Sequence, residues 1–574
     1  MHPAVEFAAR GVCYRPWPGG AMDRAAYPTL DEIDATIDHW VATLPGWVHC
    51  TVIGHSLQGR PIHLITIGDR TTNPDHRPAF WLDAGTHCAE WSGMAAAMDA
   101  LDRWGAELQA GEPLTDWLRQ HTIYLVPCIS PDGYAAMLKG APYIRSTMRP
   151  PVEGTVRTGW SPEDMDGDGV VRLIRWRHPA GPFMIDETEP LHMRFRTLDD
   201  DPADAFFVAE EGQFVCWDGV RWTGAPREFG LDLNRNFPGG WKPASMFGMD
   251  TGAFSGSAPE ARTVLDALHT RTNVSAVITL HTFTGCLLTA PYRADTPLGA
   301  ADVKLLQSLG RDCVADTPYA AIPVHPDFTY DAKNPVGGVF SDTLATVFGV
   351  AGYTLEIWDP FAAAGVKPKN TATFFSNPEP DVLLGLVRRF ASEPGTKPWT
   401  PLDHPQLGAV EVGGLELQRT VRNPPEDLLD AELDIVFRVV DRARRALPRV
   451  TCRVQVQPRG PESADLHIVV ENIGYLGTAG LERAAQVGRV PGIRVTVDGP
   501  GGRVLEKNLG HLDGWGQTRS GSGAMPLMPN LPSRGHRAHV TVPVSGQGPW
   551  TVTWHSVRAG RGTVQIDRQS QWVD

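Results

Sequence analysis

The sequence has no excess of basic residues and no long apolar run. Its 52 Lys and Arg are outnumbered by 66 Asp and Glu, which gives a formal net charge of -14. Nucleic acids and anionic membrane surfaces bind clustered Lys and Arg, so this balance argues against both as the main partner. No apolar stretch approaches the length that a membrane span requires.

A secretory signal is also missing from the start of the sequence. The first twenty residues, MHPAVEFAARGVCYRPWPGG, contain no basic start followed by an apolar core. We therefore expect a cytoplasmic protein, or a secreted one if a signal was removed before this numbering begins.

Cysteine is scarce, since only eight occur in 574 residues and none forms a C-x-x-C pair. This spacing excludes a dense disulfide framework and fits a reducing compartment. Internal repeats and low-complexity tracts are likewise missing. A chain of this length is too long for one small core, so two or three domains are expected.

The chain predicts an α/β fold from about residue 27 to 390, where apolar runs alternate with helical segments. The stretch TLDEIDATIDHWVATL is typical of a helix, with Thr29 as its N-cap. Five apolar runs are the clearest strand candidates: 60–68, 79–85, 122–130, 275–281 and 352–358.

Three parts are predicted along the chain. Residues 1–395 form the α/β domain, interrupted at about 150–230 by an acidic, turn-rich insertion. A Pro-rich connector follows over 396–449 and contains an amphipathic helix at 424–448. Short β-branched runs between Gly and Pro turns then predict an all-β sandwich over 450–574.

The stretch FWLDAGTHCAEWSGMAAAMDAL places His87 and Glu90 where a predicted strand meets a predicted helix. Side chains three apart on a helical turn lie on the same side and can share one metal ion. The pattern H-x-x-E alone is weak, because about one match is expected by chance at ordinary Glu frequency in a chain with 19 His.

Further polar residues lie near the ends of other predicted strands. His281 closes AVITLH, Glu356 lies late in GYTLE, and the turn GLDLNRNF contains Asp232, Asn234 and Arg235. In an open α/β sheet, functional residues collect at the carboxyl ends of strands. Two His and one Glu are typical of catalytic zinc, and a further carboxylate is what hydrolysis needs as a general base.

Six short blocks make the chain resemble the zinc carboxypeptidases of the carboxypeptidase A type. They are DAGTHCAEW, SPDGY, YIRSTMRP, GLDLNRNF, ITLHTFTG and YTLEIWD, and they follow the family's order over roughly residues 25–390. The resemblance implies a mixed sheet flanked by helices. The predicted sandwich at the C-terminal end resembles the accessory β-domains that are appended to members of this family.

The resemblance also implies roles for residues that match the family's motifs. The zinc ligands fall on His87, Glu90 and His281. The catalytic base falls on Glu356, and the cation that polarises the scissile carbonyl falls on Arg145.

The substrate-binding residues carry over in the same way. Asn234 and Arg235 match the pair that binds the terminal carboxylate of the substrate, and Asp232 matches a carboxylate that holds the first zinc histidine in one tautomer. For the family's mobile-loop tyrosine, the strict count falls on Lys333, whereas Tyr330 fits if the loop is longer.

Phe340 aligns with the position that lines the family's side-chain pocket. This alignment favours apolar or aromatic terminal residues in the substrate. A one-residue shift would instead bring Asp342 to that place and favour basic ones.

The resulting prediction is a zinc metallocarboxypeptidase that releases the last residue of peptides with a free carboxylate. Two alternatives remain open. One is a zinc amidase that acts on a small molecule or a cell-wall peptide, and the other is a carboxypeptidase-like binding protein without turnover. The oligomeric state is not predicted.

A second metal site is suggested by the loop DMDGDG. Asp164, Asp166 and Asp168, followed by Gly169, match the first half of a calcium-binding loop. Arg175 stands where such a loop requires a bidentate Glu, which excludes a standard EF-hand. An Asx-turn without calcium is the alternative.

Overall fold

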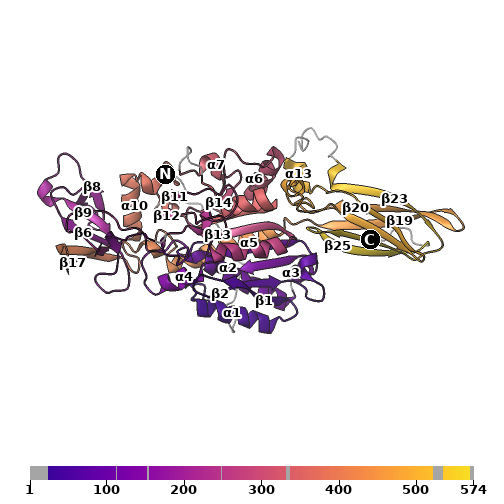
Figure 1. The fold of residues 1–574 in the computed structure, drawn as a ribbon, viewed down its shortest axis with the longest axis horizontal. Coiled ribbons are helices and arrows are strands. Elements are labelled where there is room, and N and C mark those ends of the chain that lie inside the picture. The colour runs from indigo at the N-terminus through magenta and orange to yellow at the C-terminus, as the bar shows by residue number, and fades with distance from the viewer. Residues whose placement is uncertain are drawn as a thin grey trace, which may run out of the picture.

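The computed structural model describes residues 23–111, 113–151, 154–246, 248–330, 336–520 and 534–568. Figure 1 shows an elongated molecule with an α/β body in the middle, a small sheet at one end and a β-domain at the other. Among the described residues, no helix has both the length and the apolar character needed to cross a membrane.

The α/β body is built on one mixed sheet of eight strands, ordered β1-β2-β4-β3-β13-β16-β14-β15. The predicted mixed α/β fold is confirmed. Strands β4, β3, β13 and β16 run parallel to one another, so their carboxyl ends meet at one edge. The strand bounds are β1 (Val48–His55), β2 (Pro61–Ile67), β3 (Ala79–Ala84), β4 (Thr122–Val126), β13 (Val274–Thr282), β14 (Cys286–Thr289), β15 (Ala320–Pro323) and β16 (Ala351–Ile357).

Helices cover both faces of this sheet. Alternate residues of β3 enter different cores: Phe80 and Leu82 join one cluster, and Trp81 joins the other. This alternation follows from the twofold period of a strand. The first cluster includes residues of α1 (Leu30–Thr43), α2 (Trp91–Ala110), α6 (Ala300–Val314) and α11 (Glu426–Arg444), and the second includes residues of α5 (Pro259–Thr270).

Local sequence signals explain where several helices begin. The α1 helix starts after the predicted N-cap Thr29, which forms a capping box with Glu32. The α11 helix starts directly after a Pro pair, as its sequence predicts. The remaining α-helices are α3 (Pro113–Gln120), α4 (Pro131–Leu138), α7 (Val324–Asp327), α8 (Phe340–Thr343), α9 (Pro360–Ala363), α10 (Pro380–Phe390), α12 (Glu482–Gln486) and α13 (Trp515–Ser520).

The predicted insertion contains more regular structure than its irregular sequence suggests. Its strands are β5 (Gly159–Pro162), β6 (Leu173–Arg177), β7 (Phe183–Ile185), β8 (Met193–Phe195), β9 (Phe206–Glu210) and β10 (Gly212–Val215), and the short hairpin β11 (Ser245–Met246) and β12 (Met249–Asp250) follows it. Four of these strands form a sheet with two strands from the predicted connector, in the order β17-β18-β6-β9-β7-β8.

The first part of the predicted connector therefore belongs to the sheet of the insertion. Strand β18 (Gly408–Gly414) pairs with β6, and Val412 lies opposite Ile174 in the small core that both residues share. Strand β17 (Lys397–His404) forms the edge of the sheet, the position where Pro residues are tolerated. The predicted domain boundaries at 395 and 450 remain predictions.

The structure does not support the calcium site predicted at Asp164, Asp166 and Asp168. Arg172 donates to both carboxylate oxygens of Asp168 at 2.8 Å. Lys397 lies 2.7 Å from Asp166 and 2.9 Å from Asp168, so protein cations take the place where a metal ion would bind. The Asp164 carboxylate accepts backbone N–H groups of its own loop, as expected of an Asx-turn.

The C-terminal β-domain consists of two antiparallel sheets around one core. The first contains β19 (Val450–Gly460), β20 (Ser463–Asn472) and β23 (Arg537–Ser545), and the second contains β21 (Arg494–Gly499), β22 (Gly502–Asn508), β24 (Trp550–Ser556) and β25 (Gly560–Ile566). Alternate Val and Ile side chains of both sheets fill the space between them. This arrangement confirms the predicted extra β-domain.

A buried arginine joins the β-domain to the α/β body. Arg558, only 1% exposed, donates from Nη1 to the carbonyls of Gly349 and Ala479 at 2.6 Å and from Nη2 to the carbonyl of Phe348 at 2.7 Å. Since Gly349 and Phe348 belong to the α/β body, the Arg558 guanidinium connects the two parts through buried hydrogen bonds.

Candidate metal centre

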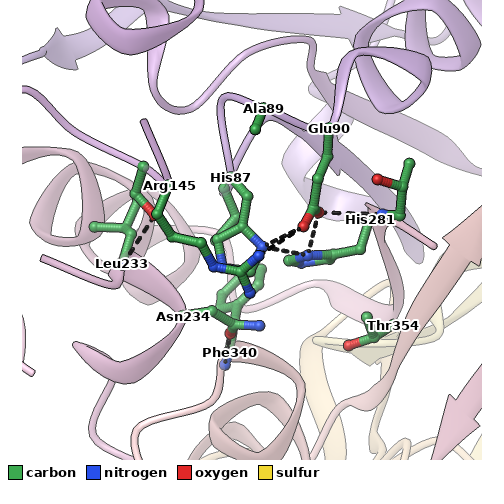
Figure 2. Close-up of polar contacts among 12 residues, drawn as sticks. His87, Ala89, Glu90, Arg145, Leu233, Asn234, His281, Phe340 and Thr354 are labelled. Atoms are coloured by element: carbon green, nitrogen blue, oxygen red, sulfur yellow. Dashed lines mark hydrogen bonds and ion pairs between the residues drawn. The ribbon is translucent and has the colours of Figure 1, made fainter. Parts of the chain in front are cut away.

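The three predicted metal ligands come together at the carboxyl edge of the central sheet. His87 follows β3, Glu90 is the N-cap of α2, and His281 lies near the end of β13. The Nδ1 atoms of His87 and His281 each lie 2.9 Å from one oxygen of the Glu90 carboxylate, and they lie 3.0 Å from each other (Figure 2).

These residues fit a zinc ion by the chemistry of their donor atoms. All three are at most 2% exposed, and their ligand atoms lie within 4.8 Å of one another. Two ring nitrogens that face each other can share only one proton, whereas a cation accepts a lone pair from both. Two His and one Glu leave a fourth position open, as in catalytic zinc sites.

The charges around Glu90 keep it ionised. Burial by itself would raise the pKa of Glu90, but the adjacent imidazoles of His87 and His281 hold this pKa well below its usual value. Burial lowers the pKa of His281. An ionised carboxylate beside a neutral imidazole is the state in which both groups can bind a metal ion.

Short-range features of the sequence bring the ligands to this edge. Strand β3 ends at Ala84, and Gly85 turns the chain with a φ of 73°. A side chain at Gly85 would place its Cβ 3.1 Å from the backbone nitrogen of Ile129, so the turn requires glycine. In the parallel pairing of β13 with β16, His281 lies opposite Glu356.

The backbone next to Glu90 is held by a segment in the predicted connector. Asn423, which is fully buried, donates to the carbonyl of Ala89 at 3.0 Å and accepts hydrogen bonds from the amide and hydroxyl of Ser92. Gln418 donates to the same Ala89 carbonyl. The sequence contains no signal for this role, since an Asn before a Pro pair is typical of an ordinary turn.

Asp232 lies behind the first histidine, as the resemblance implies. Its carboxylate is 3.1 Å from His87 Nε2, and Arg145 lies 3.5 Å from the other oxygen of Asp232. Arg145 also donates to Glu90 at 3.1 Å. Burial acts to raise the pKa of Asp232, but the guanidinium groups of Arg235 and Arg145 hold it well below its usual value.

Glu356 is the carboxylate that the structure leaves unpaired. It lies half-buried on β16, and its side chain makes no hydrogen bond or ion pair with any other described residue. Burial and then the negative charge of Glu90 raise its pKa well above the usual value, while Arg145 and Arg235 oppose this shift. The Glu356 carboxylate is therefore more basic than an exposed one, as a general base requires.

Asn234 and Arg235 lie in one turn, the 3₁₀ helix Leu233–Arg235. Arg235 is 9% exposed, donates from Nη1 to the Asn234 carbonyl, and has a buried Nε without any partner. No carboxylate pairs with it in the described part of the chain. The Asn234 side chain accepts the Phe340 amide at 2.9 Å through its oxygen, which leaves its NH₂ group without a hydrogen bond to the residues described (Figure 2).

Tyr330 lies close to the centre, whereas Lys333 is outside the described residues. Desolvation raises the pKa of Tyr330, and the charges of Arg235 and Arg145 act against this shift. The phenol is thus within electrostatic reach of both arginines.

Phe340 and Asp342, the two candidates for a side-chain pocket, are both buried. The Phe340 ring is fully buried and its centroid lies 4.6 Å from that of Phe237 in the core. Asp342 is 1% exposed and pairs with Arg293 at 3.2 Å. Both side-chain preferences therefore remain predictions.

A mixed sheet with a His–Glu–His centre at the carboxyl ends of its strands defines a metal-binding α/β protein. Comparison with known families identifies the family to which the chain belongs. The zinc carboxypeptidase family matches residues 33–170 and 203–373, which is more than half of the chain. The chain belongs to this zinc-dependent family of peptidases, and a domain of unknown function matches residues 450–567.

Individual relatives cover smaller parts of the chain. Carboxypeptidase A2 of Rattus norvegicus is 35% identical over 116 residues, which is 20% of this chain and 27% of the relative. Carboxypeptidase A1 of Rattus norvegicus is 33% identical over 142 residues, or 25% of this chain and 33% of the relative. The chain thus spans about a third or less of the length of these relatives.

Solved structures are similar at low identity. A carboxypeptidase A from Helicoverpa armigera is 16% identical and has a TM-score of 0.38, with coverage of 64% of this chain and 73% of that one. A metallo-carboxypeptidase from Burkholderia cenocepacia is 14% identical and has a TM-score of 0.34, with coverage of 72% and 68%.

Proposed function

We propose that this protein is a zinc metallocarboxypeptidase that hydrolyses the C-terminal peptide bond of peptides with a free carboxylate. The observation that carries the proposal is the Arg235 guanidinium, which lies buried beside a histidine–carboxylate metal centre, forms no ion pair with the residues described and has an Nε without a partner. A buried, unpaired cation is costly unless a ligand supplies the missing anion.

His87, Glu90 and His281 would hold the zinc ion. When bound, zinc supplies Lewis acidity, which lowers the pKa of water toward neutrality and polarises a carbonyl group. The unpaired Glu356 carboxylate accepts the proton of the attacking water. Arg145 donates hydrogen bonds to the oxygen on which negative charge develops, in a site where water is largely excluded.

Arg235 and Asn234 determine which peptide bond is attacked. The Arg235 guanidinium binds the terminal carboxylate by charge-assisted hydrogen bonds, and the free NH₂ group of Asn234 adds a further donor. Both residues lie in the short 3₁₀ helix that Asp232 caps, and the Asp232 carboxylate contacts the metal ligand His87. This short connection leaves room for about one residue beyond the scissile bond.

The direct test compares two peptides that differ only at the C-terminus. The protein loaded with zinc is given a peptide with a free carboxylate and the same peptide as its amide, and the products are identified by mass. We expect single-residue release from the free acid. The amide leaves Arg235 unpaired, a loss of at least about 2 kcal/mol, and should therefore be cleaved at least about thirtyfold more slowly, since 1.4 kcal/mol corresponds to a factor of ten. Equal rates would favour the amidase alternative, and no cleavage of either would favour the binding protein.

A further inference from the structure

A cavity of about 310 Å³ lies where the β-domain meets the α/β body. Its lining comes from residues before β3 and β4, from the junction at 448–450 and from the β-domain near the start of β25. Because the metal centre lies at the carboxyl ends of the parallel strands, this cavity is at the opposite end of the sheet. At its wall, a side chain at Gly560 would place its Cβ 3.2 Å from Pro78, so the two parts are in close contact there.

The charged residues that line the cavity are all basic. They include four arginines and no Asp or Glu: Arg77, Arg119, Arg449 and Arg561. Arg119 pairs with Asp116 at 2.6 Å. The guanidinium groups of Arg449 and Arg561 make no ion pair and no hydrogen bond with the residues that the structure describes. Two exposed cations therefore face the cavity with no protein partner.

Arg77 adds a third cation, which forms no ion pair with the residues described. It is 6% exposed, and its guanidinium donates only to the hydroxyls of Thr122 and Thr72, both at 3.3 Å, while Nη2 is buried without a partner. The charges of Asp69 and Asp75 act on Arg77, but neither acid pairs with it or lines the cavity. Asp69 accepts the amide and hydroxyl of Thr71, and Asp75 accepts the hydroxyl of Tyr124. A buried guanidinium without a carboxylate is unusual in proteins.

His121 does not change the net charge of the cavity lining. Burial lowers the pKa of His121 to about 4, so the ring is neutral at ordinary pH and adds no charge. No carboxylate lines the cavity between Arg77, Arg449 and Arg561, and an anion bound there would reduce the repulsion among them.

We propose that this cavity binds a small polyvalent oxyanion, with phosphoryl, sulfuryl or carboxylate groups, and that the bound anion stabilises the contact between the two parts of the molecule. The planar guanidinium groups match the oxygens of such an anion. Arg77 belongs to the α/β body, Arg449 to the junction and Arg561 to the β-domain, so one anion contacts all three segments.

Calorimetric titration of the zinc-loaded protein tests the proposal. Inorganic phosphate, sulfate and succinate are titrated separately, so that phosphoryl, sulfuryl and carboxylate chemistry are compared. We expect saturable binding of at least one anion, weakened at least tenfold in the double variant Arg449→Ala, Arg561→Ala. Absence of saturable binding, or the same affinity in the double variant, would overturn the proposal.

A matched control separates the cavity from general surface charge. Arg494→Ala removes an exposed arginine of the same β-domain, outside the cavity lining, that pairs with Glu506 at 3.5 Å. This variant should bind the anion as the unmodified protein does, and an equal loss would contradict the proposal. The single variant Arg561→Gln serves if the double variant fails to fold, and it should weaken binding in the same direction.

Thermal unfolding gives an independent measurement. Anions such as sulfate stabilise folded proteins generally by exclusion from the surface, and this effect should be equal in all variants. Binding to the cavity adds a rise in Tm that saturates with anion concentration. The saturating rise in Tm should be present in the unmodified protein and missing in the double variant. A saturating rise of the same size in both proteins would refute the anion site. Peptide turnover is not part of either readout.

Discussion

The Nδ1 atoms of His87 and His281 lie 3.0 Å apart at the carboxyl edge of the central sheet. Both atoms also contact the Glu90 carboxylate. One proton cannot satisfy two ring nitrogens and two carboxylate oxygens at such distances, whereas a divalent cation can. This relationship is the basis for the first prediction.

Purified protein should contain one zinc ion per chain, and His87→Ala or His281→Ala should reduce the zinc content to less than about a tenth, because two ligands do not hold zinc tightly. Elemental analysis measures this directly. His467→Ala, which removes a histidine of the β-domain, should keep the metal. Full zinc content in either ligand variant would show that the metal binds elsewhere.

Glu356→Gln should keep zinc and fold but lose at least about a hundredfold in kcat, the usual scale for a general base. The substitution preserves the shape of the side chain and removes its basicity. Steady-state kinetics on a peptide with a free carboxylate checks the effect, with zinc content as the control. Turnover equal to that of the unmodified protein would assign the base to another residue.

Arg235→Ala should remove most of the discrimination between free and amidated peptides. The loss corresponds to about 2 to 5 kcal/mol, by analogy with buried charge pairs from which one partner is removed. Zinc content should not change. Arg149→Ala is a matched control, because Arg149 pairs with Asp250 and lies near the same turn. If Arg235→Ala retains the discrimination, another cation binds the carboxylate.

Asn423→Ala should weaken zinc binding by about ten- to a hundredfold, the range seen when groups that orient metal ligands are removed. The variant loses the hydrogen bonds to Ala89 and Ser92 on either side of Glu90. Competition with a chelator measures the zinc dissociation constant. The thermal stability of the metal-free variant is measured in parallel, and a lower Tm without weaker zinc binding would limit Asn423 to a structural role.

Arg558→Ala should destabilise the contact between the β-domain and the α/β body. The variant removes the Arg558 donor from three buried carbonyls, of which only that of Gly349 keeps another donor among the described residues, the Leu481 amide; each unsatisfied group costs about 1 to 3 kcal/mol. Urea unfolding followed by separate probes for the two parts should then show two transitions in place of one. Arg453→Ala, which removes an exposed arginine of β19, is the control. A single unchanged transition in Arg558→Ala would contradict this role.

Much of the fold could be predicted from local patterns. The five apolar runs became β2, β3, β4, β13 and β16, and Thr29 caps α1 as expected. These features depend on interactions between residues close in sequence, such as a capping hydrogen bond or a run of side chains that must be buried. The same reasoning placed His87, Glu90 and His281 near strand ends, and the order of the family's blocks identified them as one set.

The features that were not predicted depend on residues distant in sequence. The acidic loop with Asp166 and Asp168 resembled half of a calcium site, but besides the nearby Arg172 it meets Lys397, which comes from a strand more than 200 residues later. Phe340 aligned with a pocket position, yet its ring packs against Phe237 in the core.

The sequence by itself determined the α/β class, the extra β-domain and the candidate ligands, because period, turn chemistry and motif order are all properties of neighbouring residues. Only the tertiary structure decided which charges are neutralised and which are not. Asp168 meets two cations, whereas Arg235 and Glu356 form no ion pair with the described residues. The reason is physical: a side chain's charge is compensated by whatever the fold brings within a few ångströms of it, and that neighbour is set by the packing of distant segments.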